Sequence, residues 1–427
     1  MIEKGLALGI LILVYALMIS EKVHRTVAVL MGASMMVGLG IVSEFQVIKF
    51  IHWEALGLIF GMFIIVGALA ETGFFRWVGL HALRATKFDP LKIFILFSII
   101  SAVLAAFMDS ITVMIFMATL TIEACRVMDV KPLSFLIAQI ASANIGGAAT
   151  MVGDPPNVLI GTSLGYSFMD FVVNVGPIAV VLFIVNIVLM RYLFRKSFVK
   201  HPVDMERIYK EHAELEPFSA IKDVRHMQMC ISIFAFTVTM LVLHQYLDMM
   251  VATVAIIGAT LVLLTGGRRA PELVEKIDWH TILFLAGLFV VVGGLDAVGL
   301  LTDFANFIVS STGGDPIIIV SALLWVFAPI SAFLDNVPFA AAMIPVIRTI
   351  HETTGMPLST LAWTLAIVSD VSGNATPIGS SASVVGVSVA KREGFHIGWK
   401  EYCKTAFPAM LVCIAVANVM IVAIFLL

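Results

Sequence analysis

The chain has 427 residues, of which 60% are hydrophobic and only 13% carry a charged side chain, and its mean hydropathy is +1.04. Soluble domains carry charges on roughly a quarter of their residues, so this composition excludes an ordinary soluble protein and indicates a chain that folds in lipid. The net charge of −3 gives no reason to expect a nucleic-acid partner, and the four cysteines show no metal-ligand spacing.

The apolar segments predict an all-α polytopic membrane protein. Each is long enough to cross a hydrocarbon core of about 30 Å. The predicted crossings are 4–20, 27–43, 54–73, 134–165, 171–190, 230–246, 250–265, 281–300, 360–390 and 402–427. Two further segments, 91–125 and 316–350, are too long for one crossing and have a polar centre. We expect each of them to form a re-entrant hairpin, which gives about ten transmembrane helices plus two hairpins.

The two halves of the chain align when the sequence is shifted so that Trp53 meets Trp279. At the same offset the segment FMDS, which ends at Ser110, meets FLDN, which ends at Asn336. The glycine-rich segment GAATMVG at 147–153 meets GNATPIG at 373–379. Matches at Trp, Asp and Thr-x-x-Gly in one register indicate an internal repeat rather than chance similarity between apolar stretches.

The predicted repeats have opposite orientations in the membrane, because each contains an odd number of crossings. Such inverted repeats are typical of secondary transporters. The predicted organisation is a first repeat over 1–190 (hairpin 91–125, broken helix 134–165), a cytoplasmic linker over 191–226, and a second repeat over 227–427 (hairpin 316–350, broken helix 360–390). If both termini are outside, most of the 26 Lys and Arg residues fall in cytoplasmic loops, which predicts a multi-pass protein of the inner membrane.

Polar residues inside the spans cluster at the hairpin tips and at the glycine-rich breaks, in matching positions of both repeats. Polar groups at membrane depth are costly, so each of them is a candidate for function. The tip candidates are Asp109, Ser110, Thr112, Asp335 and Asn336. The break candidates are Asn144, Thr150, Asp154, Asn157, Asp370, Asn374, Thr376, Ser380 and Ser381. Broken helix ends expose backbone N–H and C=O groups, and the carboxylates can hold a proton or Na⁺. We expect no catalytic residues, no metal centre and no cofactor beyond this coupling ion.

The segment GGAATMVGDPPNVLIG, residues 146–161, resembles the signature of a group within the ion transporter superfamily. The group comprises the arsenite efflux pump, the NhaD sodium–proton antiporter and the melanosomal P protein. The resemblance implies a scaffold formed by the first spans of each repeat and a transport domain formed by the hairpins and broken helices. It also makes a homodimer plausible. Relatives carry Ser-Asn-Thr motifs at the hairpin tips, where this chain has Asp109 and Asp335 as leading residues, which favours proton coupling or direct cation binding.

Three functions fit these observations. The first is efflux of arsenite or antimonite in exchange for protons, since a neutral metalloid hydroxide can bind to hydroxyl and amide groups. The second is Na⁺/H⁺ antiport through the aspartates. The third is transport of a carboxylate or another organic anion, against which stands the scarcity of Arg and Lys inside the spans. A cytoplasmic ATPase partner that docks on 191–226 is left open, although the chain has no phosphate-binding loop of its own.

Overall fold

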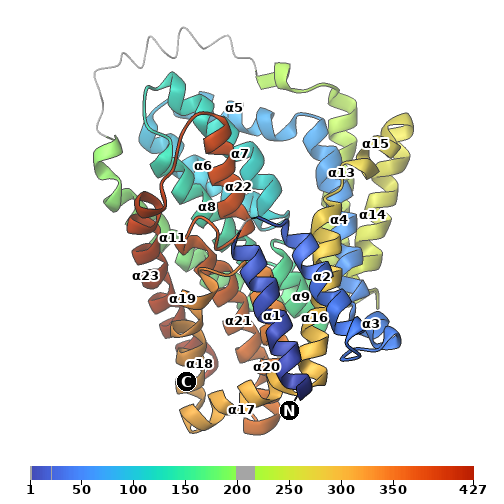
Figure 1. Cartoon of the computed structure of the whole chain (residues 1–427). Coiled ribbons are helices and arrows are strands. Elements are labelled where there is room, and N and C mark those ends of the chain that lie inside the picture. The colour runs from blue at the N-terminus through green and yellow to red at the C-terminus, as the bar shows by residue number, and fades with distance from the viewer. Residues whose placement is uncertain (1, 21, 199–216) are drawn as a thin grey trace.

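The computed structural model describes residues 2–20, 22–198 and 217–427, and these ranges fold into helices joined by short turns (Figure 1). Seven helices of the described ranges are long and apolar enough to cross a membrane. They are α1 (Ile2–Ile19), α4 (Trp53–Glu71), α7 (Ser110–Val127), α11 (Gly176–Leu193), α13 (Val224–Leu243), α16 (Trp279–Ala297) and α23 (Trp399–Phe425). The predicted class, an all-α polytopic membrane protein, is confirmed.

Shorter apolar helices complete the bundle. They are α2 (Arg25–Gly38), α6 (Pro90–Ala105), α8 (Leu133–Ala148) and α14 (Val251–Gly266). Helix α8 continues after a break into α9 (Pro155–Leu164), and α21 (Leu358–Ser372) continues after a break into α22 (Ser381–Arg392). These two interrupted helices lie where the sequence predicts broken spans.

Both segments predicted as re-entrant hairpins fold as antiparallel helix pairs. Helices α6 and α7 meet at a tip that ends at Asp109. The second hairpin enters the bundle through α18 (Pro316–Trp325) and α19 (Phe327–Ser331), and returns through α20 (Asn336–Thr354). Helix α17 (Leu300–Thr312) meets the α18–α19 segment at an angle of 117°, as expected where a chain turns from the membrane face into the bundle.

Aspartate caps start the hairpin helices. The carboxylate of Asp89 accepts a hydrogen bond from the backbone N–H of Lys92 at 3.0 Å, and Asp315 accepts from those of Ile317 and Ile318 at 2.8 and 3.0 Å. Each of these aspartates is followed by a proline in the first helical turn. Asp-Pro is a strong helix start, because the aspartate satisfies a free N–H and proline already has a helical φ.

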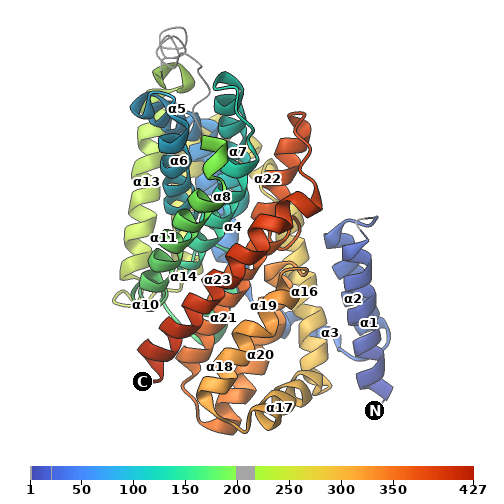
Figure 2. The ribbon, with the colours of Figure 1, turned by 90° about the vertical axis from the view of Figure 1, so that its left-hand side faces the viewer.

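The helices form two groups. In one group α1 packs on α2, α2 on α16, α4 along α14, and α13 on α14. The other group joins both hairpins to α8, α9, α11, α21, α22 and α23. Figure 2 shows the α1–α2 pair standing to one side of the second group. The assignment of these groups to a scaffold and a transport domain, which the resemblance implies, stays a prediction.

Corresponding helices of the two halves have closely matching bounds. Helices α4 and α16 are both 19 residues long, and α5 (Phe74–Thr86) and α17 are both 13 residues long, each pair at the offset that relates Trp53 to Trp279. Helices α5 and α17 each follow a glycine with positive φ, Gly73 at 88° and Gly299 at 74°. This agreement supports the division into two repeats, which stays a prediction.

Both chain termini lie at the same end of the bundle, and α5 and α15 (Ala270–Glu275) lie at the other end (Figure 1). The short helices α3 (Glu44–Phe50) and α10 (Phe168–Asn174) lie in the half of the bundle nearer the termini (Figure 2). Segments 74–86 and 300–312, which the sequence analysis left as loops, are therefore amphipathic helices across the ends of the bundle. Of the predicted linker 191–226, residues 199–216 lie outside the described residues. Which end faces the cytoplasm stays a prediction.

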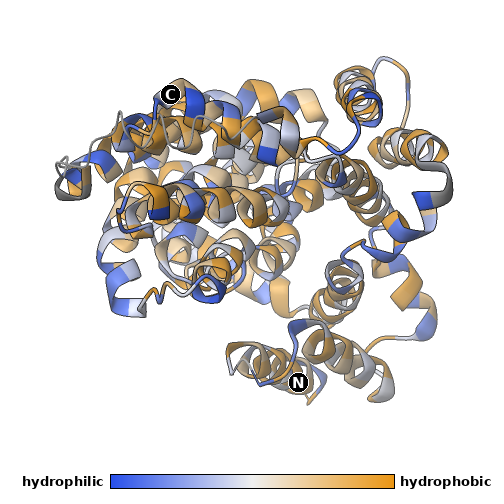
Figure 3. Ribbon diagram, turned by 90° about the horizontal axis from the view of Figure 1, so that it is seen from above, coloured by the Kyte–Doolittle hydropathy of each residue, from blue (hydrophilic) through white to orange (hydrophobic). Residues whose placement is uncertain are grey.

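The outside of the bundle is apolar. Seen from above, hydrophobic residues occur along all sides of the helices, including the surface (Figure 3). Large apolar side chains such as Val188, Leu264, Phe307 and Val419 are exposed. A surface of this kind suits lipid, whereas the polar residues of interest are gathered inside the second helix group.

Candidate functional site

The first hairpin brings two predicted residues to its tip. Asp109 caps α7, and its carboxylate accepts a hydrogen bond from the backbone N–H of Thr112 at 2.8 Å. The next residue, Ser110, is buried and donates from its hydroxyl to the carboxylate of Asp154 at 2.7 Å. The second hairpin repeats this arrangement, with Asp335 as the cap of α20, accepting from the N–H of Val337 at 3.3 Å.

Each hairpin tip is fastened to the break of its own repeat. The hydroxyl of Thr150 donates to the backbone carbonyl of Ala106, and the hydroxyl of Thr376 donates to that of Ala332. Glycine makes this close approach feasible: a Cβ at Gly153 would lie 2.6 Å from the carbonyl oxygen of Ala105. The hydroxyls of Thr150 and Thr376 therefore connect each hairpin tip to the broken helix of its own repeat. From the sequence alone, this structural role could not be distinguished from ion binding.

The centre of the site brings together two carboxyl groups, those of Asp154 and Asp370, which share a hydrogen-bond donor in Asn336. They come from different repeats, and both side chains are buried. The side-chain amide of Asn336 donates to both of them, at 2.7 Å to Asp154 and 3.3 Å to Asp370. The amide of Asn157 donates to Asp370 at 3.1 Å. Two neighbouring buried carboxyl groups cannot both ionise without strong mutual repulsion, so the pair is suited to binding a proton or a cation.

Asn144, Asn374 and Ser380 form a neighbouring neutral cluster. The amide of Asn144 donates to the side-chain oxygen of Asn374 at 2.7 Å and to the hydroxyl of Ser380 at 2.8 Å. At the repeat offset, Asn144 corresponds to Asp370 and Ser380 corresponds to Asp154. The two repeats therefore build equivalent contacts, one between two carboxyl groups and one between an amide and a hydroxyl.

Three buried amide oxygens in this region have no hydrogen-bond partner among the described residues: Oδ1 of Asn144, Asn157 and Asn336. Unpaired polar atoms are costly in the interior. A carbonyl-type oxygen beside a carboxylate is also a ligand that a hard monovalent cation prefers. The network can therefore accept either a proton or a cation.

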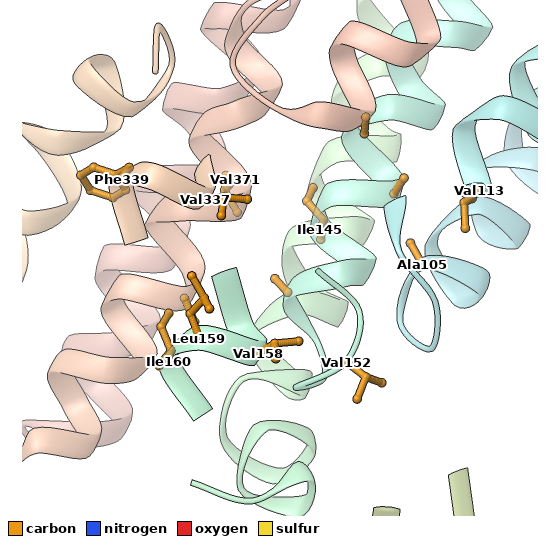
Figure 4. Close-up of a cluster of buried hydrophobic side chains, with 14 of the residues drawn as sticks. Ala105, Val113, Ile145, Val152, Val158, Leu159, Ile160, Val337, Phe339 and Val371 are labelled. Atoms are coloured by element: carbon orange, nitrogen blue, oxygen red, sulfur yellow. The ribbon is translucent and has the colours of Figure 1, made fainter. Parts of the chain in front are cut away.

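Apolar side chains enclose the network. Figure 4 shows Val337 beside Val371, which places the start of α20 next to the end of α21. Val152 and Val158 flank the break between α8 and α9 in the same view, and all four are buried. Exclusion of water from this region strengthens the electrostatic interactions among the buried polar groups.

A cavity of about 710 Å³ lies between α1, the start of α2, the tip of the second hairpin and α22. Two predicted residues, Asp335 and Ser381, line it, together with four basic side chains: His24, Arg25, Lys391 and His396. Arg25 donates to the carboxylate of Asp335 at 2.8 Å and to the hydroxyl of Ser381 at 3.2 Å. Asp278 also faces the cavity, but its carboxylate caps α16 by accepting from the N–H and the hydroxyl of Thr281.

The predicted site residues therefore separate into three places. Ser110, Asp154, Asn157, Asn336 and Asp370 surround the carboxyl pair, and the Asn144 cluster lies in the same buried region. Asp335 and Ser381 face the cavity. Asp109 and Thr112 lie at the first hairpin tip, where Asp109 borders a small pocket of about 20 Å³ against α4.

Sequence reasoning missed the basic residues of the cavity. It assigned Arg25 to a loop between the first two spans, and no repeat mate marked it, because the corresponding position is Val251. The only signal in the sequence is a basic residue directly before an apolar helix.

Residues 15–368 match the family described as citrate transporter, CitMHS. This chain belongs to the citrate transporter family. An uncharacterized transporter of Mycobacterium tuberculosis is 33% identical over 419 residues, which cover 97% of this chain and 96% of that protein. The 46 kDa membrane protein of Mycobacterium leprae is 31% identical over 422 residues, 97% of each chain.

The human P protein is 28% identical to this citrate transporter family member over 490 residues, which cover 96% of this chain and 58% of the human protein. The expected relationship to the melanosomal P protein is thereby confirmed, and the protein is a multi-pass transporter rather than an enzyme. The likeness to arsenite pumps and NhaD antiporters stays a prediction.

Proposed function

We propose that this citrate transporter family member moves a small carboxylate anion and couples its movement to a proton at the Asp154–Asp370 pair. The observation that carries the proposal is the 710 Å³ cavity, in which Arg25, His24, Lys391 and His396 surround the second hairpin tip. The scarcity of basic residues inside the spans was an argument against transport of an anion. That argument is weaker because Arg25 lines the cavity.

The size of the cavity suits such a substrate. Small-molecule sites typically enclose about 300–1,000 Å³, and a dicarboxylate or tricarboxylate fits within this range. Arg25 offers a planar pair of donors that can bind a carboxylate bidentately, and Ser381 offers a hydroxyl beside it. The family's description as a citrate transporter agrees with this substrate class.

The carboxyl pair supplies the coupling. At a separation of about 4 Å and an effective dielectric constant of about 20, two carboxylate charges repel by about 4 kcal/mol. The doubly ionised state is therefore disfavoured about a thousandfold, since about 1.4 kcal/mol corresponds to a factor of ten. Release of a proton from the pair, or its replacement by a cation, changes the charge of the carboxyl groups. It therefore changes the strength of the hydrogen bonds that they accept from both hairpin tips and from the first break.

Two alternatives remain for the same site. Na⁺ as coupling ion, or Na⁺/H⁺ antiport without an organic substrate, is favoured by the three unpaired amide oxygens of Asn144, Asn157 and Asn336. Efflux of arsenite or antimonite is supported by the hydroxyl and amide groups of the network, which can bind a neutral metalloid hydroxide. We further propose an inner-membrane location with both termini outside, and leave a homodimer and a cytoplasmic ATPase partner as proposals.

The purified protein reconstituted in liposomes tests these functions side by side. Labelled citrate, labelled succinate and arsenite are each offered under the same imposed pH gradient, with Na⁺ or choline as the salt. Movement of a carboxylate that depends on the gradient supports the proposal. Arsenite movement with no carboxylate movement would replace it with metalloid efflux, and collapse of the gradient on Na⁺ addition alone would replace it with antiport.

A further inference from the structure

Arg25 joins the two helix groups of the protein. It is the first residue of α2, in the group that contains α1 and α16, and its guanidinium holds Asp335 and Ser381, which belong to the second hairpin and to α22. These contacts connect residues 310 and 356 positions apart in the chain. The side chains of Arg25 and Asp335 are 30% and 13% exposed, so the ion pair is shielded from bulk water but reachable from the cavity.

The arginine is held firmly on the α2–α16 side. Its guanidinium lies 5.3 Å from the ring centre of Phe284 on α16, a cation–π contact. The neighbouring residue His24 packs against His280 with ring centres 4.7 Å apart and ring planes tilted by 50°, and the hydroxyl of Thr26 donates to the backbone carbonyl of His280 at 3.0 Å. Arg25 is therefore anchored to α16, whereas Asp335 belongs to the second hairpin, whose helix α20 also contacts α16.

The first hairpin has a different environment at the equivalent position. Asp109 is the repeat mate of Asp335, but the pocket beside it is lined by the apolar residues Leu58, Ile59, Met62 and Phe63 of α4. Among the described residues, Oδ2 of Asp109 has no hydrogen-bond partner. The two hairpin tips therefore differ in their surroundings. Arg25 of the first helix group binds Asp335 at the second tip, whereas apolar residues of α4 face Asp109 at the first tip.

We propose that the Arg25–Asp335 ion pair is a releasable latch that holds the two helix groups in the described arrangement until substrate binds, and that Arg25 then binds the substrate anion. The inference rests on the proposed function in taking a carboxylate as the substrate. Movement of one helix group past the other requires this ion pair to break. An anion that binds Arg25 and Ser381 takes the place of the Asp335 carboxylate, and Asp335 is then free to accept a proton or a cation.

Two inverted repeats can in principle adopt two arrangements, in each of which a different hairpin tip faces an open cavity. Because the first hairpin tip contacts apolar residues of α4 and not a cation, the ion pair stabilises only one of these arrangements. It therefore favours the arrangement in which the cavity beside Asp335 is open. A ligand shifts such an equilibrium only through a difference in its affinity for the two states, and competition with Asp335 for Arg25 supplies that difference.

The latch is tested by measuring the distance between spin labels at Val27 on α2 and Arg392 on α22 in the full-length protein, with the native cysteines replaced. Without substrate, the unaltered pair is expected to give one dominant distance. Arg25→Gln and Asp335→Asn each remove the ion pair from one side, and both are expected to populate a second distance at least several-fold more. Arg25→Lys keeps the charge and is expected to stay close to the wild-type distribution.

Lys276→Gln is the matched control, because Lys276 forms an ion pair with Glu71 on α4 that lies within the first helix group and does not line the cavity. It is expected to leave the distance distribution unchanged. Unchanged distributions in folded, monodisperse Arg25→Gln and Asp335→Asn would overturn the latch. The measurement needs no substrate, so a latch without any citrate transport would contradict only the proposed substrate. As a second readout, the dissociation constant for citrate is expected to rise at least tenfold in Arg25→Gln.

Discussion

Asp370→Asn is the substitution that isolates the carboxyl pair. In the structure, Oδ1 of Asp370 accepts from Asn336 at 3.3 Å and Oδ2 accepts from Asn157 at 3.1 Å. An asparagine at 370 has one oxygen and one NH₂ group, so whichever way it turns, one donor of the network meets another donor. The contact with Asp154 remains sterically the same but contains a single ionisable group.

The magnitudes predict a folded protein without coupling. Loss of one hydrogen bond to a charged acceptor costs about 1.5–3 kcal/mol. The substitution relieves little repulsion, because the doubly ionised pair is already disfavoured in the wild type. We therefore expect a folded protein whose thermal midpoint is lowered only by the loss of this hydrogen bond. We expect the proton flux that accompanies substrate to fall about a hundredfold or more, because only one carboxyl group of the pair is left to bind a proton.

The assay records proton movement with a pH-sensitive dye and labelled citrate in the same liposomes. Asp303→Asn, which removes an exposed carboxylate paired with Lys4, is the control and should behave as the wild type. Citrate binding should persist in Asp370→Asn, since residue 370 does not line the cavity. Wild-type proton flux per citrate in Asp370→Asn would refute the assignment of coupling to this pair.

Three further predictions address the framework of the site. Gly153→Ala places a Cβ 2.4 Å from the carbonyl oxygen of Gly147 and should cost about 1–3 kcal/mol, visible as a lower thermal midpoint in detergent; an unchanged midpoint would contradict the close approach. Thr376→Val removes the hydrogen bond to the carbonyl of Ala332 at nearly constant side-chain volume. It should lower the free energy of unfolding by about 1 kcal/mol, again visible as a lower thermal midpoint. The backbone N–H at position 226 lowers the pKa of Asp223, so this cap stabilises the start of α13 at neutral pH and loses its effect as the pH falls through that lowered pKa. Asp223→Ala should therefore speed amide exchange in the first turn of α13 at pH 7 but not in strong acid.

The helix breaks and helix caps of the site could be predicted from the sequence, whereas the contacts between its residues could not. Glycine and proline in a long apolar run predict a break whatever surrounds it, so the ends of α8 and α21 were located correctly. The aspartate before each returning helix, Asp109 or Asp335, caps that helix, in line with the preference of aspartate for this position. Such local features depend on neighbouring residues and can be read along the chain.

Contacts between the halves could not be predicted in this way. Asp154 and Asp370 meet because two broken helices pack side by side, and the repeat relates each to a different partner, Ser380 and Asn144. Arg25 reaches Asp335 because α2 docks on α16, a packing that no local pattern encodes. The amphipathic helices α5 and α17 were missed because a short segment that follows a glycine between two spans is also typical of a loop.

The central claim, proton-coupled transport of a carboxylate, is tested most directly by accumulation. Liposomes that contain the protein receive labelled citrate at equal concentration on both sides, and a pH gradient is then imposed. The account predicts that citrate accumulates on one side beyond equilibrium, that reversal of the gradient reverses the direction, and that a protonophore abolishes the effect. Citrate that stays at equal concentration on both sides, in liposomes shown to contain folded protein, would contradict it.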